Sequence, residues 1–284
     1  MFNIRNKIKQ LYIKETKYQK LEILEDKGYL EFYINNEVQW CSSDEFIYHE
    51  TLVLPYINYI SKSKKEINIL VLGGGDGFVI RELMKFDKKI KKITLVDIDK
   101  EVIELHKNLI YIKKLINNSL NYDKLDIKIE DAYKFIKNTK EKYDLIISDL
   151  IDPIKSLSFL YSKKMFKNLK KINNGIIIYQ AGDIFYNKYE NKKVKKHAKK
   201  ILKHYKNIYV SIPNFGYYNY ILYSKNKEYK KIRKTKFNKL LLKENKYIKS
   251  NKILKTIFLY KNIYNKRTKT IKWIQNERKN KSKK

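Results

Sequence analysis

The stretch from Ile67 to Asp99 limits the possible folds more than any other part of the chain. An apolar segment runs into Gly73-Gly74-Gly75-Asp76-Gly77, and a helical pattern then leads to a second apolar segment that ends on Asp97. This order of strand, glycine turn, helix, strand and acid is typical of the first half of a nucleotide-binding βαβ unit. Because glycine lacks a Cβ, Gly73 and Gly75 are positions where the backbone could approach a ligand closely.

The spacing of this motif narrows the kind of ligand. The sequence Gly-Gly-Gly-Asp-Gly is neither the GxGxxG of a dinucleotide-binding turn nor the GxxxxGK[ST] of a phosphate-binding loop. Asp97 would stand at the tip of the second strand, where its carboxylate could accept hydrogen bonds from ribose hydroxyls. We therefore predict an adenosine-type ligand, and the alternative is a glycine turn with a purely structural role.

Strand and helix patterns alternate from Glu66 onward. Hydrophobic strands that alternate with helices predict an α/β fold with a Rossmann-like, doubly wound, mostly parallel sheet. Residues 213–216 form a turn signal before an apolar segment at 220–223, which predicts an antiparallel strand at the end of this sheet. The expected strands are 67–72, 92–97, 125–130, 143–149, 175–180 and 207–212, and the expected helices are 77–86, 99–110, 132–138, 162–171 and 188–204.

The two ends of the chain differ from the middle. Short alternating segments begin at Tyr18, Leu30 and Glu37, with Lys27-Gly28 and Asn35-Asn36 as turns between them, and Ser43-Asp44-Glu45 signals the start of a helix. We expect three parts. These are a small N-terminal antiparallel β-hairpin domain at 1–60, a Rossmann-like domain at 61–225, and a basic, partly helical extension at 226–284 whose last dozen residues form a disordered tail.

The net charge of +34 favours contact with polyanions such as nucleic acids. Only five of the 64 basic residues are arginine, the residue that makes bidentate contacts to bases and phosphates. We therefore expect a solvated lysine surface that recognises no specific nucleic acid. No apolar run approaches the length of a membrane span, the N-terminus lacks the apolar core of a secretory signal, and Cys41 has no second cysteine to pair with. These features predict a cytoplasmic protein.

The predicted strand ends carry several acids. Ligands of doubly wound sheets bind over the carboxyl ends of the strands, so these residues would face one pocket. Clustered carboxylates repel one another unless a cation offsets them, which predicts a positively charged ligand. Alternatively each acid caps its own helix, as Asp131 before Ala132 could. Pro153 prevents a helix at Asp152, so a loop should cross the strand ends before Ser162 opens the next helix. The strand-end residues are Asp76, Asp97, Asp131, Asp149, Asp152, Gln180 and Phe215.

Taken together, these motifs resemble the spermidine synthase (polyamine aminopropyltransferase) family over residues 16–224. The glycine motif and Asp149-Leu-Ile-Asp152-Pro153 are the most specific parts. The other matching segments are Tyr18-Gln19, Gln39, residues 44–50, residues 96–99, Asp131-Ala132, Gln180 and Ser211-Ile-Pro213. The resemblance implies a class I methyltransferase-like fold and transfer of an aminopropyl group from decarboxylated S-adenosylmethionine, a co-substrate, to a diamine, usually putrescine. It implies no metal or other cofactor, and a homodimer or homotetramer.

The resemblance also implies a role for each candidate residue. Asp149 would be the catalytic acid–base residue, with Tyr48 beside it. Asp97 would hold the ribose, Asp131 the adenine amino group and Asp76 the aminopropyl ammonium. The implied donor-binding residues are Gln19, Gln39, Gly73, Gly75, Asp76, Asp97, Asp131 and Ala132, and the implied acceptor-binding residues are His49, Asp76, Asp152, Gln180 and Phe215.

Three residues depart from the family pattern. Asp97 stands where many members have glutamate, Phe215 where some have tyrosine, and His49 where some have glutamine. These changes bear on the length of the substrate more than on the type of reaction. The alternatives are an S-adenosylmethionine-dependent methyltransferase of the putrescine type, a lysine-rich nucleic-acid-binding protein, and a non-catalytic relative. The sequence does not decide which amine is preferred.

Overall fold

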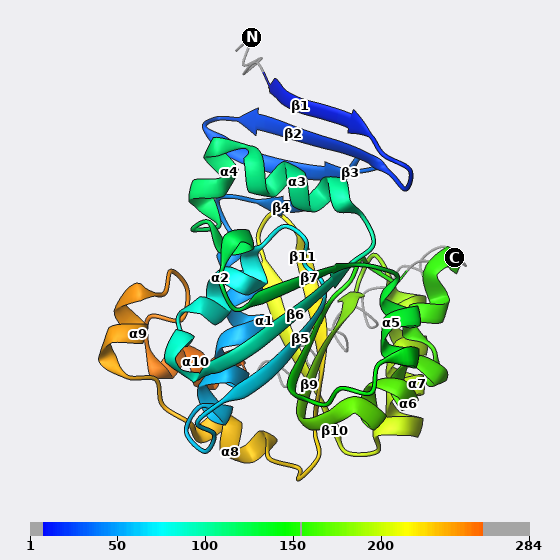
Figure 1. Ribbon diagram of the computed structural model, residues 1–284, viewed down its shortest axis with the longest axis vertical. Coiled ribbons are helices and arrows are strands. Elements are labelled where there is room, and N and C mark those ends of the chain that lie inside the picture. The colour runs from blue at the N-terminus through cyan, green and yellow to red at the C-terminus, as the bar shows by residue number, and fades with distance from the viewer. Residues whose placement is uncertain (1–7, 154, 258–284) are drawn as a thin grey trace, which may run out of the picture.

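The computed structural model describes residues 8–153 and 155–257, which form two sheets and their flanking helices (Figure 1). A small antiparallel sheet, ordered β1-β2-β3-β4, comes first in the chain, and a seven-stranded, mostly parallel sheet follows it. This arrangement confirms the predicted fold class. The strands of the small sheet are β1 (Lys9–Glu15), β2 (Lys20–Asp26), β3 (Tyr29–Ile34) and β4 (Glu37–Cys41).

The turns of the small sheet follow from their residues. Lys27 and Gly28 have φ values of 51° and 82°, and Asn35 and Asn36 have values of 51° and 65°, as tight hairpin turns require. Strand β1 is not predicted by the sequence pattern. It is an edge strand and most of its residues are exposed, so its hydrophobic alternation is weak.

The large sheet has the order β10-β11-β9-β8-β5-β6-β7. Strands β9, β8, β5, β6 and β7 are parallel, whereas β11 pairs antiparallel with both β9 and β10. The predicted antiparallel strand is therefore present, but it lies between β9 and β10, and β10 rather than β11 is the last strand of the sheet. The strands are β5 (Ile67–Gly73), β6 (Ile90–Asp97), β7 (Leu125–Ile129), β8 (Tyr143–Asp149), β9 (Asn173–Asp183), β10 (Tyr205–Ile212) and β11 (Gly216–Ser224).

Apolar side chains on both faces of this sheet form two core layers. In β5, Ile69 and Val71 belong to one layer and Leu70 and Leu72 to the other, which explains the uninterrupted apolar run. Helices α1, α2 and α3 contribute to the first layer, and α5, α6 and α7 to the second (Figure 1). The helices are α1 (Glu45–Ile60), α2 (Phe78–Met84), α3 (Lys100–Asn108), α4 (Ile110–Leu115), α5 (Ala132–Asn138), α6 (Lys163–Ile172), α7 (Lys188–Leu202), α8 (Tyr229–Lys234), α9 (Lys239–Glu244) and α10 (Asn251–Ile257), with short 3-10 helices η1 (Asp87–Lys89), η2 (Ser119–Asn121) and η3 (Lys155–Tyr161).

Two connections differ from expectation. The helix expected at 99–110 ends at Asn108, because Leu109 adopts an extended conformation with φ −68° and ψ 115°, and a further helix, α4, begins at Ile110. The segment after Pro153 contains the 3-10 helix η3 rather than an irregular loop. Ser162 does open the next helix as predicted, since its hydroxyl accepts the N–H of Met165 at 3.2 Å.

The first part of the C-terminal extension is tied to α1. The buried carboxylate of Glu50 accepts the backbone N–H groups of Lys246, Tyr247 and Ile248 at 2.6, 3.0 and 2.7 Å. The predicted disordered tail lies outside the described residues, and the three-part domain division stays a prediction. Within residues 8–153 and 155–257, no helix is both long enough and apolar enough to cross a membrane.

Candidate functional site

Three of the predicted acids lie together at the C-terminal ends of strands β5, β6 and β8 of the large sheet. In the pairing of β5 with β8, Gly73 lies opposite Asp149. Gly73 has a φ of 75°, and a Cβ at this position would lie 2.2 Å from the carbonyl oxygen of Asp149. Glycine is therefore needed for the turn after β5 to pass so close to the end of β8. On the other side of β5, strand β6 ends at Asp97, and the turn itself carries Asp76.

Asp97 is oriented by the backbone around it. Its Oδ2 accepts the N–H of Gly75 at 3.0 Å, and its Oδ1 accepts the N–H of Asp99 at 3.0 Å. A Cβ on Gly75 would lie 2.7 Å from Oδ2, so glycine is needed here as well. Burial raises the pKa of Asp97 to about 6, although the two N–H groups act in the opposite direction. A carboxylate held in this way keeps further lone pairs for the hydroxyls of a ligand.

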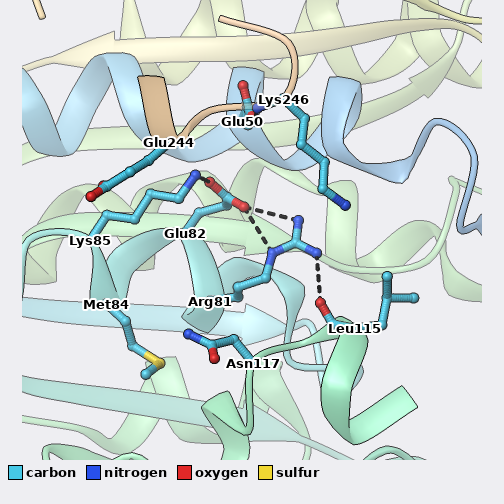
Figure 2. Close-up of a pocket in the computed structure, with 9 residues that line it drawn as sticks. All are labelled: Glu50, Arg81, Glu82, Met84, Lys85, Leu115, Asn117, Glu244 and Lys246. Atoms are coloured by element: carbon cyan, nitrogen blue, oxygen red, sulfur yellow. Dashed lines mark hydrogen bonds and ion pairs between the residues drawn. The ribbon is translucent and has the colours of Figure 1, made fainter. Parts of the chain in front are cut away.

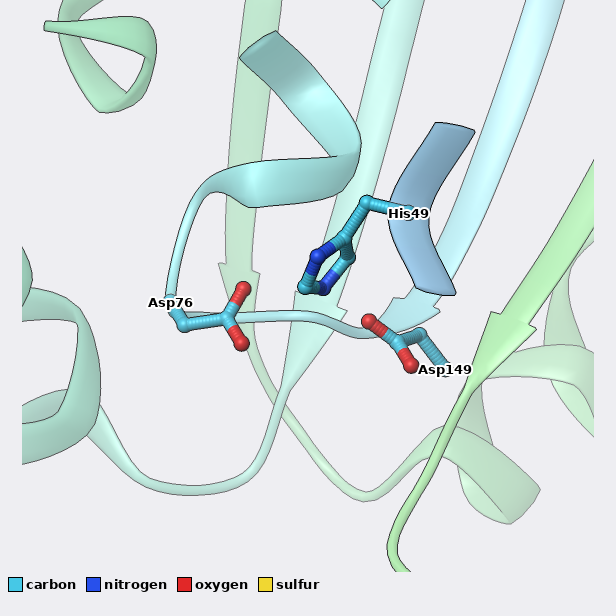
Figure 3. Close-up of side chains that lie close together, drawn as sticks. All are labelled: His49, Asp76 and Asp149. Carbon is cyan, nitrogen blue, oxygen red and sulfur yellow. The ribbon is translucent and has the colours of Figure 1, made fainter. Parts of the chain in front are cut away.

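His49, Asp76 and Asp149 come together from α1, the glycine turn and the end of β8 (Figure 3). One atom from each side chain lies within 4.8 Å of the others. Burial raises the pKa of Asp76 to about 7, with His49 opposing the shift and Asp149 adding to it. Burial also raises the pKa of Asp149, whereas His49 and Tyr48 lower it. Two carboxyl groups in these conditions become easier to ionise when a cation lies between them.

Tyr48 lies directly against Asp149. Its hydroxyl donates a hydrogen bond to Asp149 Oδ1 at 2.6 Å. The ring is held edge-on between Tyr218 and Tyr220, with centroid distances of 5.6 and 5.4 Å. Burial and the charge of Asp149 raise the pKa of Tyr48 well above its usual value, so the hydroxyl remains a donor at neutral pH.

Asp152 gathers three donors just beyond β8. The side-chain amide of Gln180 donates to Oδ1, while Asn187 and Tyr218 donate to Oδ2 at 2.7 and 3.3 Å. Burial raises the pKa of Asp152 to about 6 despite the bonds from Gln180 and Tyr218. Asp152 and Gln180 are among the residues that the sequence predicts for the site, whereas Asn187 and Tyr218 are not. For Tyr218 the available signal was its place on the antiparallel strand next to β9; Asn187 follows no motif.

Asp131 and Ala132 lie where β7 leads into α5. Asp131 caps this helix, because its Oδ1 accepts the N–H of Lys134 at 2.8 Å. The helix-cap alternative is thus realised at this position, and a ligand role would be additional to it. Ala132 is buried as the first residue of the helix.

The remaining predicted residues, Gln19, Gln39 and Phe215, do not contact Asp76, Asp97 or Asp149 through any hydrogen bond described for them. Gln19 donates to Asp99 at 3.0 Å, two residues beyond Asp97. Gln39 donates to the carbonyl oxygen of Glu37 in its own strand at 3.0 Å. Phe215 packs against the ring of Tyr218 with a centroid distance of 5.8 Å, which places it near Asp152.

Two cavities lie apart from Asp76 and Asp149. The first, of about 420 Å³, is lined by acids and bases that largely pair with one another, as Arg81, Glu82 and Lys85 do (Figure 2). Because this cavity contains no predicted site residue, we assign it no ligand. The second, of about 350 Å³, is lined in part by Thr16 and Asp99 and thus lies beside the end of β6.

A small cation would fit among His49, Asp76 and Asp149. Burial lowers the pKa of His49, but the hydrogen bond and charge of Glu45 and the charges of Asp76 and Asp149 together raise it, so the ring holds a proton that a metal ion would have to displace. An ammonium group of an organic ligand can bind to the two carboxylates, through hydrogen bonds as well as charge, while the ring keeps its proton. The arrangement therefore suits an ammonium better than a metal ion.

The fold and the site define a Rossmann-like α/β protein with a cluster of acids at the C-terminal ends of its parallel strands. Residues 45–236, more than half of the chain, match the family model described as the spermine/spermidine synthase domain. The chain belongs to the spermine/spermidine synthase family, as the sequence motifs predicted.

Several curated proteins are similar to this chain. It is 36% identical over 218 residues to "Polyamine aminopropyltransferase 2" of Aquifex aeolicus, which covers 76% of this chain and 43% of the relative. It is 40% identical over 170 residues to "Polyamine aminopropyltransferase" of Sulfurisphaera tokodaii, covering 59% of this chain and 55% of the relative. The chain therefore spans about half the length of the curated relatives it matches.

Solved structures support the fold. A spermidine synthase in complex with the transition state analogue AdoDATO superposes with a TM-score of 0.74 at 20% identity, covering 88% of this chain and 83% of the other. The spermidine synthase from Thermotoga maritima gives a TM-score of 0.75 at 20% identity, with coverages of 88% and 84%. At this identity the similarity shows a shared fold.

Proposed function

We propose that the protein is a polyamine aminopropyltransferase of the spermidine synthase type. It would transfer the aminopropyl group of decarboxylated S-adenosylmethionine to putrescine, giving spermidine and methylthioadenosine. The observation that carries this proposal is the pair of Tyr48 and Asp149 at the end of β8, placed beside Asp76. Membership of the family supports the same reaction.

The donor would lie across the ends of β5 and β6. Asp97 would accept hydrogen bonds from the ribose hydroxyls and Asp131 from the adenine amino group, with Gln19, Gln39 and the backbone at Gly73, Gly75 and Ala132 around the nucleoside. Asp76 would bind the ammonium at the end of the aminopropyl chain. Ordinary S-adenosylmethionine carries a carboxylate near this ammonium, and Asp76 would repel it. The carboxyl group would thus select the decarboxylated donor.

The acceptor amine must lose a proton before it can attack. With a lysine-like pKa of about 10.4, freeing its lone pair at pH 7 costs about 4.6 kcal/mol. Asp149, held by Tyr48, would take this proton and orient the nitrogen towards the carbon next to sulfur. The new C–N bond forms as the C–S bond breaks, and the electron pair of the broken bond stays on sulfur in neutral methylthioadenosine.

The far end of the acceptor would meet a second acidic group. Asp152, with Gln180 behind it, would bind the ammonium that does not react, and His49 and Phe215 would complete the walls. The raised pKa values of Asp76 and Asp152 support this arrangement, because buried acids of this kind gain most from a bound cation.

Turnover by an Asp149→Asn variant tests the assignment of the base. We expect the variant to lose turnover while it keeps most of its donor affinity, measured by product chromatography and calorimetry. Asp144→Asn is the matched control, because Asp144 is buried on the same strand but bonds to Lys64 and the N–H of Asn68 at its opposite end. Near wild-type rates in Asp149→Asn would exclude Asp149 as the base.

A substrate panel tests the reaction itself. The protein should bind decarboxylated S-adenosylmethionine more tightly than S-adenosylmethionine and should form spermidine with putrescine. Cadaverine, agmatine and spermidine as parallel acceptors would identify the preferred amine. Preference for S-adenosylmethionine, with a methylated amine as product, would replace this proposal by the methyltransferase alternative.

We also propose a cytoplasmic homodimer or homotetramer. The single cysteine, Cys41, is buried and has no second cysteine in the chain to pair with, as suits a reducing compartment. Light scattering after size-exclusion chromatography would measure the assembly, and a monomer would contradict it.

A further inference from the structure

The ring of His49 is fixed from the side that faces away from the acids. Its Nδ1 lies 2.8 Å from the carbonyl oxygen and 2.9 Å from the Oε2 of Glu45, one helical turn earlier. One ring face stacks on Phe78 with a centroid distance of 4.8 Å and an interplanar angle of 27°. The other nitrogen, Nε2, points towards the space between Asp76 and Asp149 (Figure 3).

Glu45 is itself held by an arginine. Arg81 donates from its two terminal nitrogens to the two carboxylate oxygens of Glu45, each at 2.9 Å. The side chain of Glu45 has no exposed surface, and that of Arg81 is 10% exposed. Burial tends to raise the pKa of Glu45, but His49 and Arg81 together lower it to about 2. Glu45 is therefore a permanently charged, immobile acceptor behind His49.

We propose that Glu45, clamped by Arg81, is a positioning residue that fixes the ring of His49 with Nε2 directed between Asp76 and Asp149, so that its N–H orients the carboxylates that bind the reacting amine. Its catalytic consequence rests on the aminopropyl transfer proposed above. Arg81 also lines the cavity shown in Figure 2, so the pair of Arg81 and Glu45 lies between this cavity and His49, Asp76 and Asp149.

The charges around His49 agree with this role. Glu45 lies on its own helix, Asp76 comes from the glycine turn, Asp149 with the Tyr48 hydroxyl lies at the end of β8, and Arg81 stands behind Glu45. Burial lowers the pKa of His49, but the hydrogen bond and charge of Glu45, together with the charges of Asp76 and Asp149, outweigh burial and raise the pKa. A ring charged in this way offsets the repulsion between the two acids.

Nuclear magnetic resonance of the ligand-free protein tests the clamp without reference to activity. The chain has four histidines, so ¹⁵N-labelled imidazoles can be followed individually, and the His49→Gln variant assigns the His49 signals. In wild-type protein we expect a proton on Nδ1. In Glu45→Gln the charge is lost, so His49 should titrate at a lower pH. An unchanged titration in folded Glu45→Gln would overturn the proposal.

Glu50→Gln is the matched control. Glu50 is an equally buried carboxylate on the same helix, but it accepts backbone N–H groups of residues 246–248 instead of a histidine. Its loss should lower stability and leave the titration of His49 unchanged. If the pKa of His49 shifted equally in both variants, Glu45 would have only a structural role. If Glu45→Gln does not fold, Glu45→Asp replaces it, with a smaller shift of His49 in the same direction expected and no shift as the contrary result.

Kinetics then connect the clamp to the reaction. Glu45→Gln should lower kcat by about 10-fold to 100-fold, as misplacement of a reacting group does, with little change in the KM of the donor. The same substitution in a His49→Gln background should cause no further loss, and additive losses would contradict action through His49. A wild-type protein without aminopropyl transfer would refute the proposed function and would leave the magnetic resonance test of the clamp intact.

Discussion

Replacing Tyr48 by phenylalanine removes one hydrogen bond from the proposed base and little else. The ring would keep its edge contacts to Tyr218 and Tyr220, while Asp149 Oδ1 would lose the donor at 2.6 Å. A hydrogen bond to a charged group contributes about 1.5–3 kcal/mol. If the bond orients Asp149 in the transition state, kcat/KM should fall by about 10-fold to 150-fold.

The same change should move the pH dependence. The hydroxyl of Tyr48 lowers the pKa of Asp149, so its removal raises that pKa further. Because the base must be ionised, the acid limb of kcat/KM should move to higher pH. The assay is the initial rate of spermidine formation at constant ionic strength across a range of pH.

Tyr220→Phe is the control for this experiment. Tyr220 is buried beside Tyr48, but its hydroxyl donates weakly to the carbonyl oxygen of Tyr48 at 3.4 Å rather than to Asp149. It should leave the pH profile in place. A Tyr48→Phe enzyme within about twofold of wild type, with an unmoved acid limb, would refute this account of Asp149.

Three further predictions concern the glycine turn, the site acids and the core. Gly75→Ala places a Cβ 2.7 Å from Asp97 Oδ2 and should abolish the rise in melting temperature caused by methylthioadenosine; a retained rise would contradict the role of Asp97. In the wild type, kcat/KM should increase as pH rises through about 6 to 7, because Asp76, with its pKa near 7, must ionise to bind a cation, and a flat profile there would argue against it. Tyr56→Phe should raise the free energy of unfolding by about 1 kcal/mol in urea titrations, since no described residue bonds to the buried Tyr56 hydroxyl, and a loss of stability would reveal a partner.

The parts of the structure that the sequence predicted are those with local causes. The succession of strand, glycine turn and helix predicts a βαβ unit within a few dozen residues. Parallel pairing of the strands then places Asp76, Asp97 and Asp149 together at the C-terminal ends of the strands. The need for glycine at position 73 follows from the close approach of Asp149, which only the folded structure displays. The motif thus predicted where the acids lie in the sheet, whereas the distances between them come from the structure.

The parts that were missed depend on residues far away in the chain. Asp152 receives donors from Asn187 and Tyr218, which are separated from it by 35 and 66 positions and follow no motif. Glu45 had the pattern of an ordinary helix start, and its burial against Arg81 arises only when α1 packs on α2. Strand β1 pairs along an exposed edge, so its sequence carries little hydrophobic signal.

The bond between α1 and residues 246–248 has a consequence for how the chain is made. Glu50 is separated from its three N–H partners by 196 to 198 positions. At the usual rates of translation, residues 246–248 are synthesised about 10 to 40 s after helix α1. Until then the carboxylate of Glu50 would have to stay hydrated, which opposes early burial of α1 against the sheet. The nascent protein should therefore reach its protease-resistant state late, only after this C-terminal segment has left the ribosome.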